Sequence, residues 1–317
     1  LMLQPPGGAR NVLGLDPAFR TGTKWVLVNH TGRFVKHGVI YPVPPKNQVE
    51  EARKELNAVL NEHKVDIVAI GNGTASREVF RFIRDWIKDE NHELETLVVN
   101  ESGASVYSAS KTAREEFPDL DLTVRGAVSI ARRYQDPLAE LVKIEPKSIG
   151  VGQYQHDVNQ NRLKQSLERT VESCVNYVGV DLNRASFQLL EHVSGISPGL
   201  ARNIVQHRNL NGVYSTRNDL LKVKGMGKRT FEQSAGFLRV MESENPLDQS
   251  AVHPENYTLV EQMAEHLELP LKEMVGNEEK LKLIDVKRYE EQGIGSFTLK
   301  DIIDELHKLG RDPRKDH

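Results

Sequence analysis

Two short glycine-bracketed segments, about thirty residues apart, have the residue types that bind phosphate groups. The first reads Gly195-Ile196-Ser197-Pro198-Gly199 and the second reads Gly225-Met226-Gly227-Lys228-Arg229. Glycine tolerates positive φ angles and lets a ligand approach the backbone closely. An amphipathic helix is expected to begin directly after each segment, so that unpaired N–H groups at its start would face a bound anion. Together the two segments predict a phosphate-binding surface.

The stretch from Leu189 to Val240 contains the same unit twice: an apolar helical run, a glycine turn holding one apolar residue, and a second helix. This unit resembles the helix-hairpin-helix element of sequence-independent DNA-binding proteins. The copy at Gly225 matches closely, and the copy at Gly195 matches more loosely, with Pro198 suited to a helix start. The alternative is two ordinary tight helical corners. Two copies in tandem favour a single packed bundle with a shared function.

The predicted contacts are to phosphates and not to base edges. Backbone N–H groups at the glycines would supply geometry, and lysine and arginine side chains would supply charge. The predicted nucleic-acid-binding residues are Gly195, Gly199, Arg202, Lys222, Lys224, Gly225, Gly227, Lys228 and Arg229.

The positive charge of the chain is concentrated around these residues. Residues 1–180 carry 23 Lys and Arg and 23 Asp and Glu, so this part is neutral. Residues 181–240 carry 9 basic and 4 acidic residues, a net charge of +5, whereas residues 241–317 carry 10 and 18, a net charge of −8. Because phosphate binding needs positive charge, residues 181–240 are the predicted nucleic-acid surface. The acidic end is expected to pack, to solubilise or to meet a protein partner.

Three carboxylates nearer the N-terminus could bind metal ions and cleave a phosphodiester. Asp16 ends a predicted strand, Glu101 follows another, and Asp136 is the only acid in the middle of a predicted helix over 123–142. Two-metal catalysis needs a full set of aligned ligands, and Mg²⁺ prefers oxygen ligands. Between Asp16 and Glu101 the sequence predicts one further buried strand, over 66–70. This strand is followed by Gly71-Asn72-Gly73, which offers no carboxylate. We therefore favour a domain with no catalytic role and no cofactor. The alternative is a Mg²⁺- or Mn²⁺-dependent nuclease or junction resolvase, with Asp16, Glu101 and Asp136 as catalytic and metal-binding residues.

Apolar runs and turn signals predict the elements that position these acids. Three strands come first, followed by helix, strand, helix, strand and two further helices. The predicted ranges are strands over 12–16, 24–29, 34–41, 66–70 and 96–100, and helices over 48–63, 74–89, 104–116 and 123–142. This order resembles the RNase H-like fold, and Gly14-Leu15-Asp16-Pro17 resembles the first motif of its RuvC and YqgF branch, with Ala18 where that motif has glycine.

Longer blocks of the sequence resemble the Tex family of transcription accessory proteins. They include residues 71–78, 100–108, 125–133, 135–142 and 150–158. The resemblance covers the chain from about Val12 onward. It implies a multidomain α/β and all-α protein: an RNase H-like mixed sheet with flanking helices, then tandem helix-hairpin-helix units and a small helical domain. It also implies that the first domain is a degenerate nuclease. The family's N-terminal helical region and C-terminal OB-fold RNA-binding domain are not expected within these residues.

The predicted organisation follows from these blocks and from the charge distribution. Residues 1–11 form a linker, 12–147 the YqgF or RNase H-like domain, and 148–180 a connecting segment with a helix. Residues 181–244 form the tandem helix-hairpin-helix domain, and residues 245–317 a small acidic helical domain.

The predicted function is sequence-independent binding of DNA, RNA or both, as a transcription accessory factor. A third hypothesis is a scaffold that docks onto the transcription machinery or a ribosome-associated protein. The single cysteine, Cys174, and the lack of a signal peptide or membrane-spanning run point to a cytoplasmic chain with no membrane partner. The resemblance narrows this to the bacterial cytosol or nucleoid. Strand preference and oligomeric state are left open.

Overall fold

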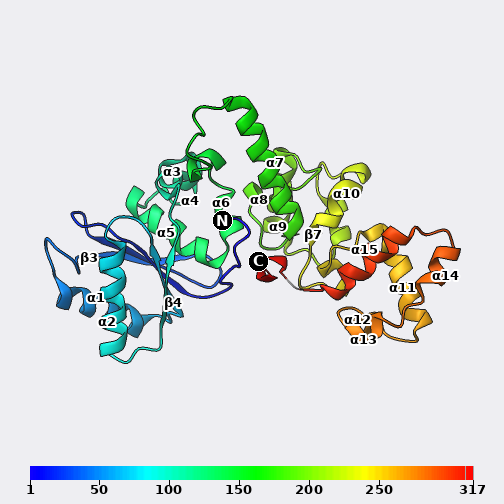
Figure 1. Cartoon of the computed structure of the whole chain (residues 1–317), viewed down its shortest axis with the longest axis horizontal. Helices are drawn as coiled ribbons and strands as arrows, with labels where there is room; N and C mark the ends of the chain where they lie inside the picture. Colours follow the sequence, from blue (N-terminus) through cyan, green and yellow to red (C-terminus); the bar gives the residue numbers. More distant parts are fainter. Residues whose placement is uncertain (311, 317) are drawn as a thin grey trace. The chain divides into compact units, whose positions relative to one another are not determined.

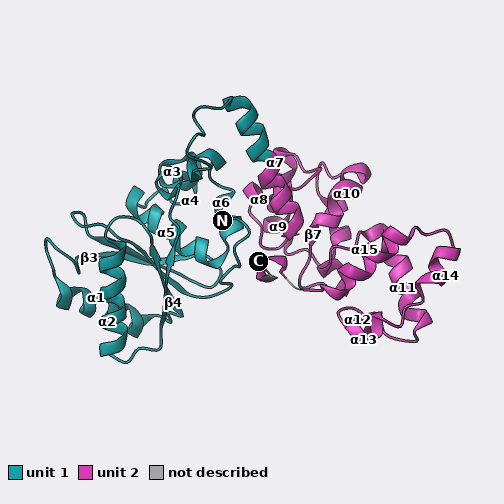
Figure 2. Ribbon diagram, in the orientation of Figure 1, with its two compact units in different colours: residues 1–168, 316–317 teal, residues 169–315 magenta. Residues whose placement is uncertain are grey.

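A computed structural model describes residues 1–310 and 312–316 of the chain. It divides into two compact units, residues 1–168 and residues 169–315 (Figure 2). The helix α7 (Gln160–Val178) contributes to both. No helix among the described residues is long and apolar enough to cross a membrane.

Unit 1 is built on one mixed sheet with helices on both faces (Figure 1). Its strands are β1 (Val12–Asp16), β2 (Thr23–Val28), β3 (Phe34–Ile40), β4 (Ile67–Gly71) and β5 (Glu95–Val99), in the spatial order β3-β2-β1-β4-β5. The β1–β2 and β2–β3 pairs are antiparallel, whereas β1–β4 and β4–β5 are parallel. The carboxyl ends of β1, β4 and β5 therefore meet at one edge, and the predicted mixed sheet is confirmed.

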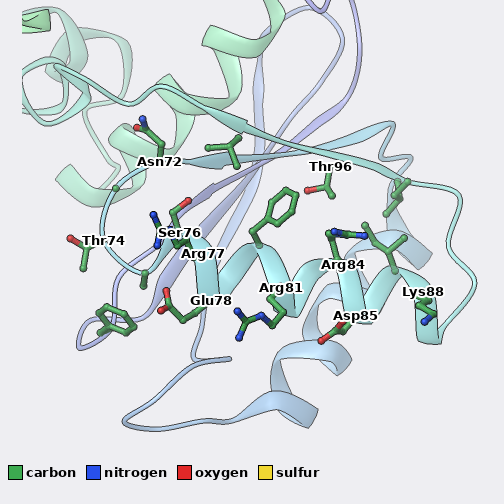
Figure 3. A pocket seen from close by; sticks show the side chains of 17 residues that line it. Asn72, Thr74, Ser76, Arg77, Glu78, Arg81, Arg84, Asp85, Lys88 and Thr96 are labelled. Atoms are coloured by element: carbon green, nitrogen blue, oxygen red, sulfur yellow. The ribbon is translucent and has the colours of Figure 1, made fainter.

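Each face of the sheet has its own apolar core. Helices α1 (Val49–Glu62) and α2 (Ser76–Asp89) cover one face, where Leu13, Trp25 and Trp86 are buried. Helix α5 (Leu122–Gln135) covers the other, against Val12 and Val26. Strands buried on both faces need nearly continuous apolar sequence, which is why β1, β2 and β4 were recognisable in the sequence. The outward side of α2, next to β5, carries several basic side chains (Figure 3).

Two helices predicted as continuous are each broken. The predicted helix over 123–142 ends at Gln135, and α6 (Pro137–Leu141) follows after Asp136, whose φ of −153° is not helical. The reason is Pro137, because a proline ring clashes with a helical conformation of the residue before it. Likewise the range 104–116 forms α3 (Ala104–Ala109) and α4 (Lys111–Glu116), separated at Ser110.

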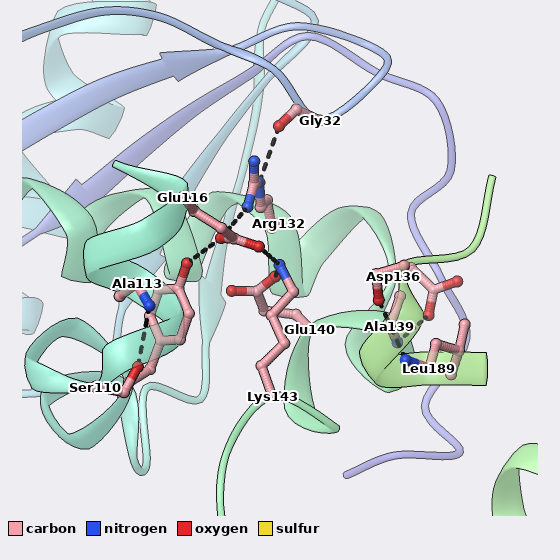
Figure 4. Close-up of polar contacts among 12 residues, drawn as sticks. Gly32, Ser110, Ala113, Glu116, Arg132, Asp136, Ala139, Glu140, Lys143 and Leu189 are labelled. Atoms are coloured by element: carbon pink, nitrogen blue, oxygen red, sulfur yellow. Dashed lines mark hydrogen bonds and ion pairs between the residues drawn. The ribbon is translucent and has the colours of Figure 1, made fainter. Parts of the chain in front are cut away.

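A partly buried ionic network fixes these short helices to α5 (Figure 4). Glu116 accepts hydrogen bonds from Tyr107 Oη at 2.5 Å, Arg132 Nη1 at 3.0 Å and Lys143 Nζ at 2.9 Å. Lys143 also pairs with Glu140 at 3.1 Å. Burial opposes ionisation of Glu116, but Lys143 and Arg132 outweigh it and hold the pKa of this carboxyl below its usual value. The network thus ties α3 and α4 to the helix that covers the sheet.

Unit 2 is helical apart from a two-stranded parallel pair, β6 (Val180–Asp181) with β7 (Leu238–Arg239), among its described residues. Its hairpin region contains α8 (Phe187–Leu190), α9 (Pro198–Asn211), the 3₁₀ helix η2 (Arg217–Lys222) and α10 (Lys228–Ser234). The remainder contains α11 (Tyr257–His266), α12 (Leu271–Met274), α13 (Glu278–Leu281), α14 (Val286–Glu291) and α15 (Ser296–His307). The predicted all-α architecture is confirmed.

A buried arginine joins the two parts of unit 2. Arg217 is fully buried and donates to the carbonyl oxygens of Ser250 and Val252 and to Tyr257 Oη. The acidic region therefore packs against the hairpin region through specific hydrogen bonds.

Candidate nucleic-acid interface and carboxylate pair

The two hairpin turns share one backbone geometry. Gly195 has φ +86° and Gly225 has φ +91°, a region that side chains with a Cβ rarely adopt. The apolar residue that follows each glycine, Ile196 or Met226, is buried and anchors its turn. The glycines are thus required by the fold of each turn before any ligand is considered.

The hairpins pack against each other reciprocally. A Cβ on Gly195 would lie 3.0 Å from Gln233 Cβ in α10, and one on Gly225 would lie 3.7 Å from Leu200 in α9. Asn203 of α9 donates to the carbonyl oxygen of Lys224 at 2.9 Å. Each turn is therefore held by the second helix of the other copy, and the pair forms one bundle.

The second glycine of each turn faces open space. A Cβ built on Gly199 or Gly227 would meet no atom within 4 Å among the described residues. Neither glycine has a positive φ. Their lack of a side chain is required neither by conformation nor by packing, so the open space beside them is the natural place for a ligand to approach the backbone.

The two copies differ at their helix starts. In α9 the Ser197 side chain accepts from Leu200 N–H at 3.3 Å, and Pro198 has no N–H to offer. In α10 the N-cap is Gly227, and no described side chain caps the N–H groups of the first turn. The second copy thus has more N–H groups available to an anion.

The predicted cations fall into two groups. Lys224, Lys228 and Arg229 are exposed and form no ion pair within the described part of the chain. Lys222 pairs with Asp219 at 2.8 Å, and Arg202 stacks over the Phe187 ring at 4.1 Å from its centroid. Lys224, Lys228 and Arg229 therefore carry most of the charge that an approaching phosphate would meet.

The first turn is already engaged by the chain itself. Ser194 N–H donates to Asn176 Oδ1 at 3.1 Å, and Ser194 Oγ donates to Glu172 Oε1 at 3.0 Å. This contact fixes the turn to α7 and brings a carboxylate beside it. The uncapped start of α10 and the engagement of the Gly195 turn by α7 both make the Gly225 turn the stronger candidate for phosphate binding.

A third turn of the same form lies in the acidic region, where the sequence was interpreted as offering no chemistry. Gly293-Ile294-Gly295 separates α14 from α15, Gly293 has φ +89°, and Gly295 is the N-cap of α15 without a described side-chain cap. The signal was present in the sequence, since the Gly-apolar-Gly pattern repeats that of Gly225-Met226-Gly227.

At the carboxyl edge of the sheet, the structure brings together two of the three candidate acids. Asp16 ends β1, and Glu101 follows β5. Burial, and secondly the charge of Glu101, raise the pKa of Asp16 to about 6, with Lys24 acting in the opposite direction. The pKa of Glu101 is also raised by burial, against a hydrogen bond from Gly73 N–H and the charge of Arg133.

Glu101 reaches this position because β4 ends in glycines. A Cβ on Gly73 would overlap Glu101 Oε1, and one on Gly71 would overlap Oε2. The carboxylate of Glu101 therefore occupies the space in which a side chain from the end of β4 would stand. Its Oε2 atom is buried and has no hydrogen-bond partner among the described residues.

The third candidate, Asp136, lies elsewhere, and its predicted place in the middle of a helix was wrong. A Cβ on Gly126 would lie 3.4 Å from Asp16 Oδ2, and Asp136 is ten residues further along, about 15 Å at the rise of an α-helix. The preceding Gln135 donates to the carbonyls of Arg10 and Asn29, beside the start of β1. Asp136 itself caps α6 by accepting from Ala139 N–H at 3.1 Å (Figure 4).

This arrangement does not fit a two-metal site. The positions of α5 beside the pair include Gly126, near Asp16, and Ile130, near Gly71, and neither is a metal ligand. Among the described residues no group of three or more His, Cys, Asp or Glu side chains could hold a metal ion. One Glu101 oxygen already faces Gly73 N–H.

The fold and the site together define a class: an RNase H-like sheet joined to tandem helix-hairpin-helix units. Family models match accordingly, the Tex protein YqgF-like domain over residues 10–135, a helix-hairpin-helix motif over 175–239 and an HHH domain over 245–314. The finer domain boundaries at 147, 180 and 244 stay predictions.

Relatives agree with this class over nearly the whole chain. Protein tex of Bordetella pertussis is 52% identical over 315 residues, which are 99% of this chain and 40% of that protein. The transcriptional accessory protein Tex of Neisseria gonorrhoeae is 49% identical, again over 99% of this chain and 41% of its own length. The human S1 RNA-binding domain-containing protein 1 is 45% identical over 76% of the chain. The chain belongs to the Tex family, and it spans about 40% of the length of the bacterial relatives that it matches.

Proposed function

We propose that this chain binds nucleic acid without regard to sequence, through the phosphates, and that it does so as part of a transcription accessory factor. The observation that carries the proposal is the open second turn. Gly227 faces free space, the N–H groups after it are uncapped, and Lys224, Lys228 and Arg229 stand beside it without ion-pair partners in the described residues. The remaining predicted contacts, Gly195, Gly199, Arg202 and Lys222, support a weaker second site at the first turn.

The helix-hairpin-helix matches and the net charge of +5 over residues 181–240 support the same proposal. Contacts to phosphate oxygens by backbone N–H groups and cations position a nucleic acid without sensing its sequence. The accessory role in transcription is proposed from the name of the gonococcal relative. The transcription machinery is the proposed partner.

The proposed role of unit 1 is structural. A two-metal nuclease needs further ligands beside Asp16 and Glu101, and no group of three or more His, Cys, Asp or Glu side chains is suitably placed among the described residues. A nuclease remains the second candidate because these two acids do converge. A cleavage assay with Mg²⁺ and Mn²⁺ on single- and double-stranded substrates separates the two. Metal-dependent cutting that is lost in Asp16→Asn would establish the nuclease.

The test of the binding proposal is fluorescence anisotropy with labelled DNA and RNA of mixed and homopolymeric sequence. Affinity should fall steeply between roughly 50 and 200 mM salt and should be nearly the same for every sequence. The pair Lys228→Glu with Arg229→Glu should weaken binding at least about tenfold and lower the salt slope by about two.

The matched control is Lys272→Glu with Lys287→Glu, which makes the same change in charge at exposed positions outside the hairpin region. It should leave the salt slope unchanged. If both pairs weaken binding equally, net charge alone accounts for the effect and the assignment to the second turn is wrong.

A further inference from the structure

A groove on unit 1 is separate from the hairpin turns and starts at Asn72 and Gly73, next to Glu101. It runs between the outward side of α2 and the strand β5, with a volume of about 1270 Å³ (Figure 3). Its lining begins at Phe19 and Asn72 and continues along α2 to Lys88. This volume exceeds that of a typical small-molecule pocket, so the groove suits a longer ligand.

One side of the groove is a basic row on α2. Arg77, Arg81, Arg84 and Lys88 follow each other at helical spacing, and all are exposed. None of them forms an ion pair within the described residues. Glu78 and Asp85 also line the groove, so its net charge is positive. The row attracts an anionic partner.

The other side is an open edge of the sheet. β5 is the last strand in the spatial order, and Val99 O accepts from Asn72 N–H at 3.0 Å on the β4 side. Because the N–H and C=O of one strand residue point to the same side and alternate along the strand, those of Thr96 and Val98 point away from β4. Both residues line the groove, and Val98 is 49% exposed.

Apolar side chains lie between the basic row and the open edge. Phe80, Ile87 and Leu94 are half-buried against the core on this face, and Phe19 is 37% exposed. A strand that paired with Thr96 and Val98 would place every second side chain over these residues. The remaining side chains would face solvent or the rim.

We propose that this groove binds an extended acidic segment of a partner protein, which pairs with β5 as an added strand. Backbone hydrogen bonds to Thr96 and Val98 would provide affinity, and contact of its acidic side chains with the row on α2 would fix its direction. A nucleic acid would meet the cations but has no backbone that matches the donors and acceptors of a strand edge. The proposal is independent of the function assigned to the hairpins.

The experiment uses the full chain and a short blocked peptide in which the side chains of one strand face are valine and glutamate by turns, because the apolar residues and the basic row lie on the same side of β5. Saturable binding is expected by anisotropy, together with slower amide hydrogen exchange at Thr96 and Val98 by NMR. Leu97 and Val99, whose N–H groups already face β4, should change little. Absence of saturable binding up to millimolar peptide, or binding without protection of Thr96 and Val98, would overturn the proposal.

Two variants separate the two sides of the groove. The double variant Arg77→Glu with Arg84→Glu should lower the affinity for the peptide about tenfold, because both positions are exposed and their charge is reversed. Val98→Pro removes the outward N–H, which an edge strand tolerates, and should abolish protection at Thr96. The charge-matched control, Lys54→Glu with Arg114→Glu at exposed positions elsewhere on unit 1, should bind as the parent does.

An oligonucleotide of matched charge is the competitor. It should not displace the peptide, and its binding should be unaffected by Arg77→Glu with Arg84→Glu. The groove is a nucleic-acid site, and the proposal is wrong, if the oligonucleotide displaces the peptide and the double variant weakens oligonucleotide binding as much as peptide binding.

Discussion

Glycines leave room beside the backbone in both units, but the room is used in opposite ways. Beside Gly71 and Gly73 it is filled by the Glu101 carboxylate, which accepts the Gly73 N–H. Beside Gly199 and Gly227 no atom of the described residues would lie within 4 Å of an added Cβ. We call the space beside Gly71 and Gly73 the filled cradle, because a carboxylate of the chain itself occupies it. The space beside Gly199 and Gly227 is the open cradle, which an anion from outside can enter.

A glycine-rich motif alone therefore does not identify a ligand site. The turn after β4 and the Gly225 turn both have glycines on either side of one residue, Asn72 or Met226. What separates them is whether a side chain of the same protein already fills the space. Whether the space is filled depends on the path of the chain after β5, which places Glu101 there from about thirty residues further along the sequence.

The largest expected effect is at the filled cradle. In Gly73→Ala the new Cβ overlaps the Glu101 carboxylate, which must move and lose its hydrogen bond, so unfolding free energy should fall by about 2–3 kcal/mol. Nucleic-acid affinity should not change. Denaturant unfolding and anisotropy measure the two quantities.

The control for Gly73→Ala is the double variant with Glu101→Ala. Because the three atoms nearest the new Cβ all belong to Glu101, the coupling energy should recover most of the loss. Additive losses would show that Glu101 does not occupy the cradle in solution.

Asp16→Asn is expected to stabilise the chain above neutral pH by about 2 kcal/mol. The folded-state pKa of Asp16, about 6, lies above its ordinary value of 3.8, so the folded chain holds this proton more tightly than the unfolded chain. The resulting stability is complete below pH 3.8 and is lost as pH rises through 6. Asparagine does not titrate and avoids the loss.

Thermal unfolding of the parent and of Asp16→Asn at a series of pH values tests this prediction. The melting temperatures of the parent and the variant should converge near pH 4 and move apart as the pH rises through 6. A variant that is less stable than the parent at pH 8 would mean that the ionised Asp16 is stabilised by a partner, as a bound cation would do.

The open cradle should respond in the opposite sense. Gly227→Ala has space for its Cβ and an ordinary negative φ of −83°, and the reduced freedom of the unfolded chain offsets alanine's weaker N-cap, so stability should change little. The methyl group stands where a phosphate would approach, and affinity should fall about tenfold, or about 1.4 kcal/mol. Unchanged affinity in anisotropy would place the ligand elsewhere.

Much of unit 1 was predictable because β1, β2 and β4 are buried on both faces and read as apolar runs. The break at Asp136 was also predictable, since Pro137 follows it directly. The position of Glu101 was not, because it depends on a carboxylate crossing the end of β4, which no local pattern encodes. In unit 2 the glycine turns were predictable, but the engagement of Ser194 by Asn176 and Glu172 required the structure.

The turn at Gly293 offers the smallest effect and the sharpest separation of backbone from charge. It has the positive-φ glycine of the Gly225 turn, but the three residues before it include Glu290 and Glu291, whereas those before Gly225 include Lys222 and Lys224. If charge is all that it lacks, Glu290→Lys with Glu291→Lys should raise nucleic-acid affinity about threefold and steepen the salt dependence. The control, Glu261→Lys with Glu265→Lys on α11, makes the same charge change away from any glycine turn. An equal gain from both pairs would show that the turn geometry adds nothing to charge.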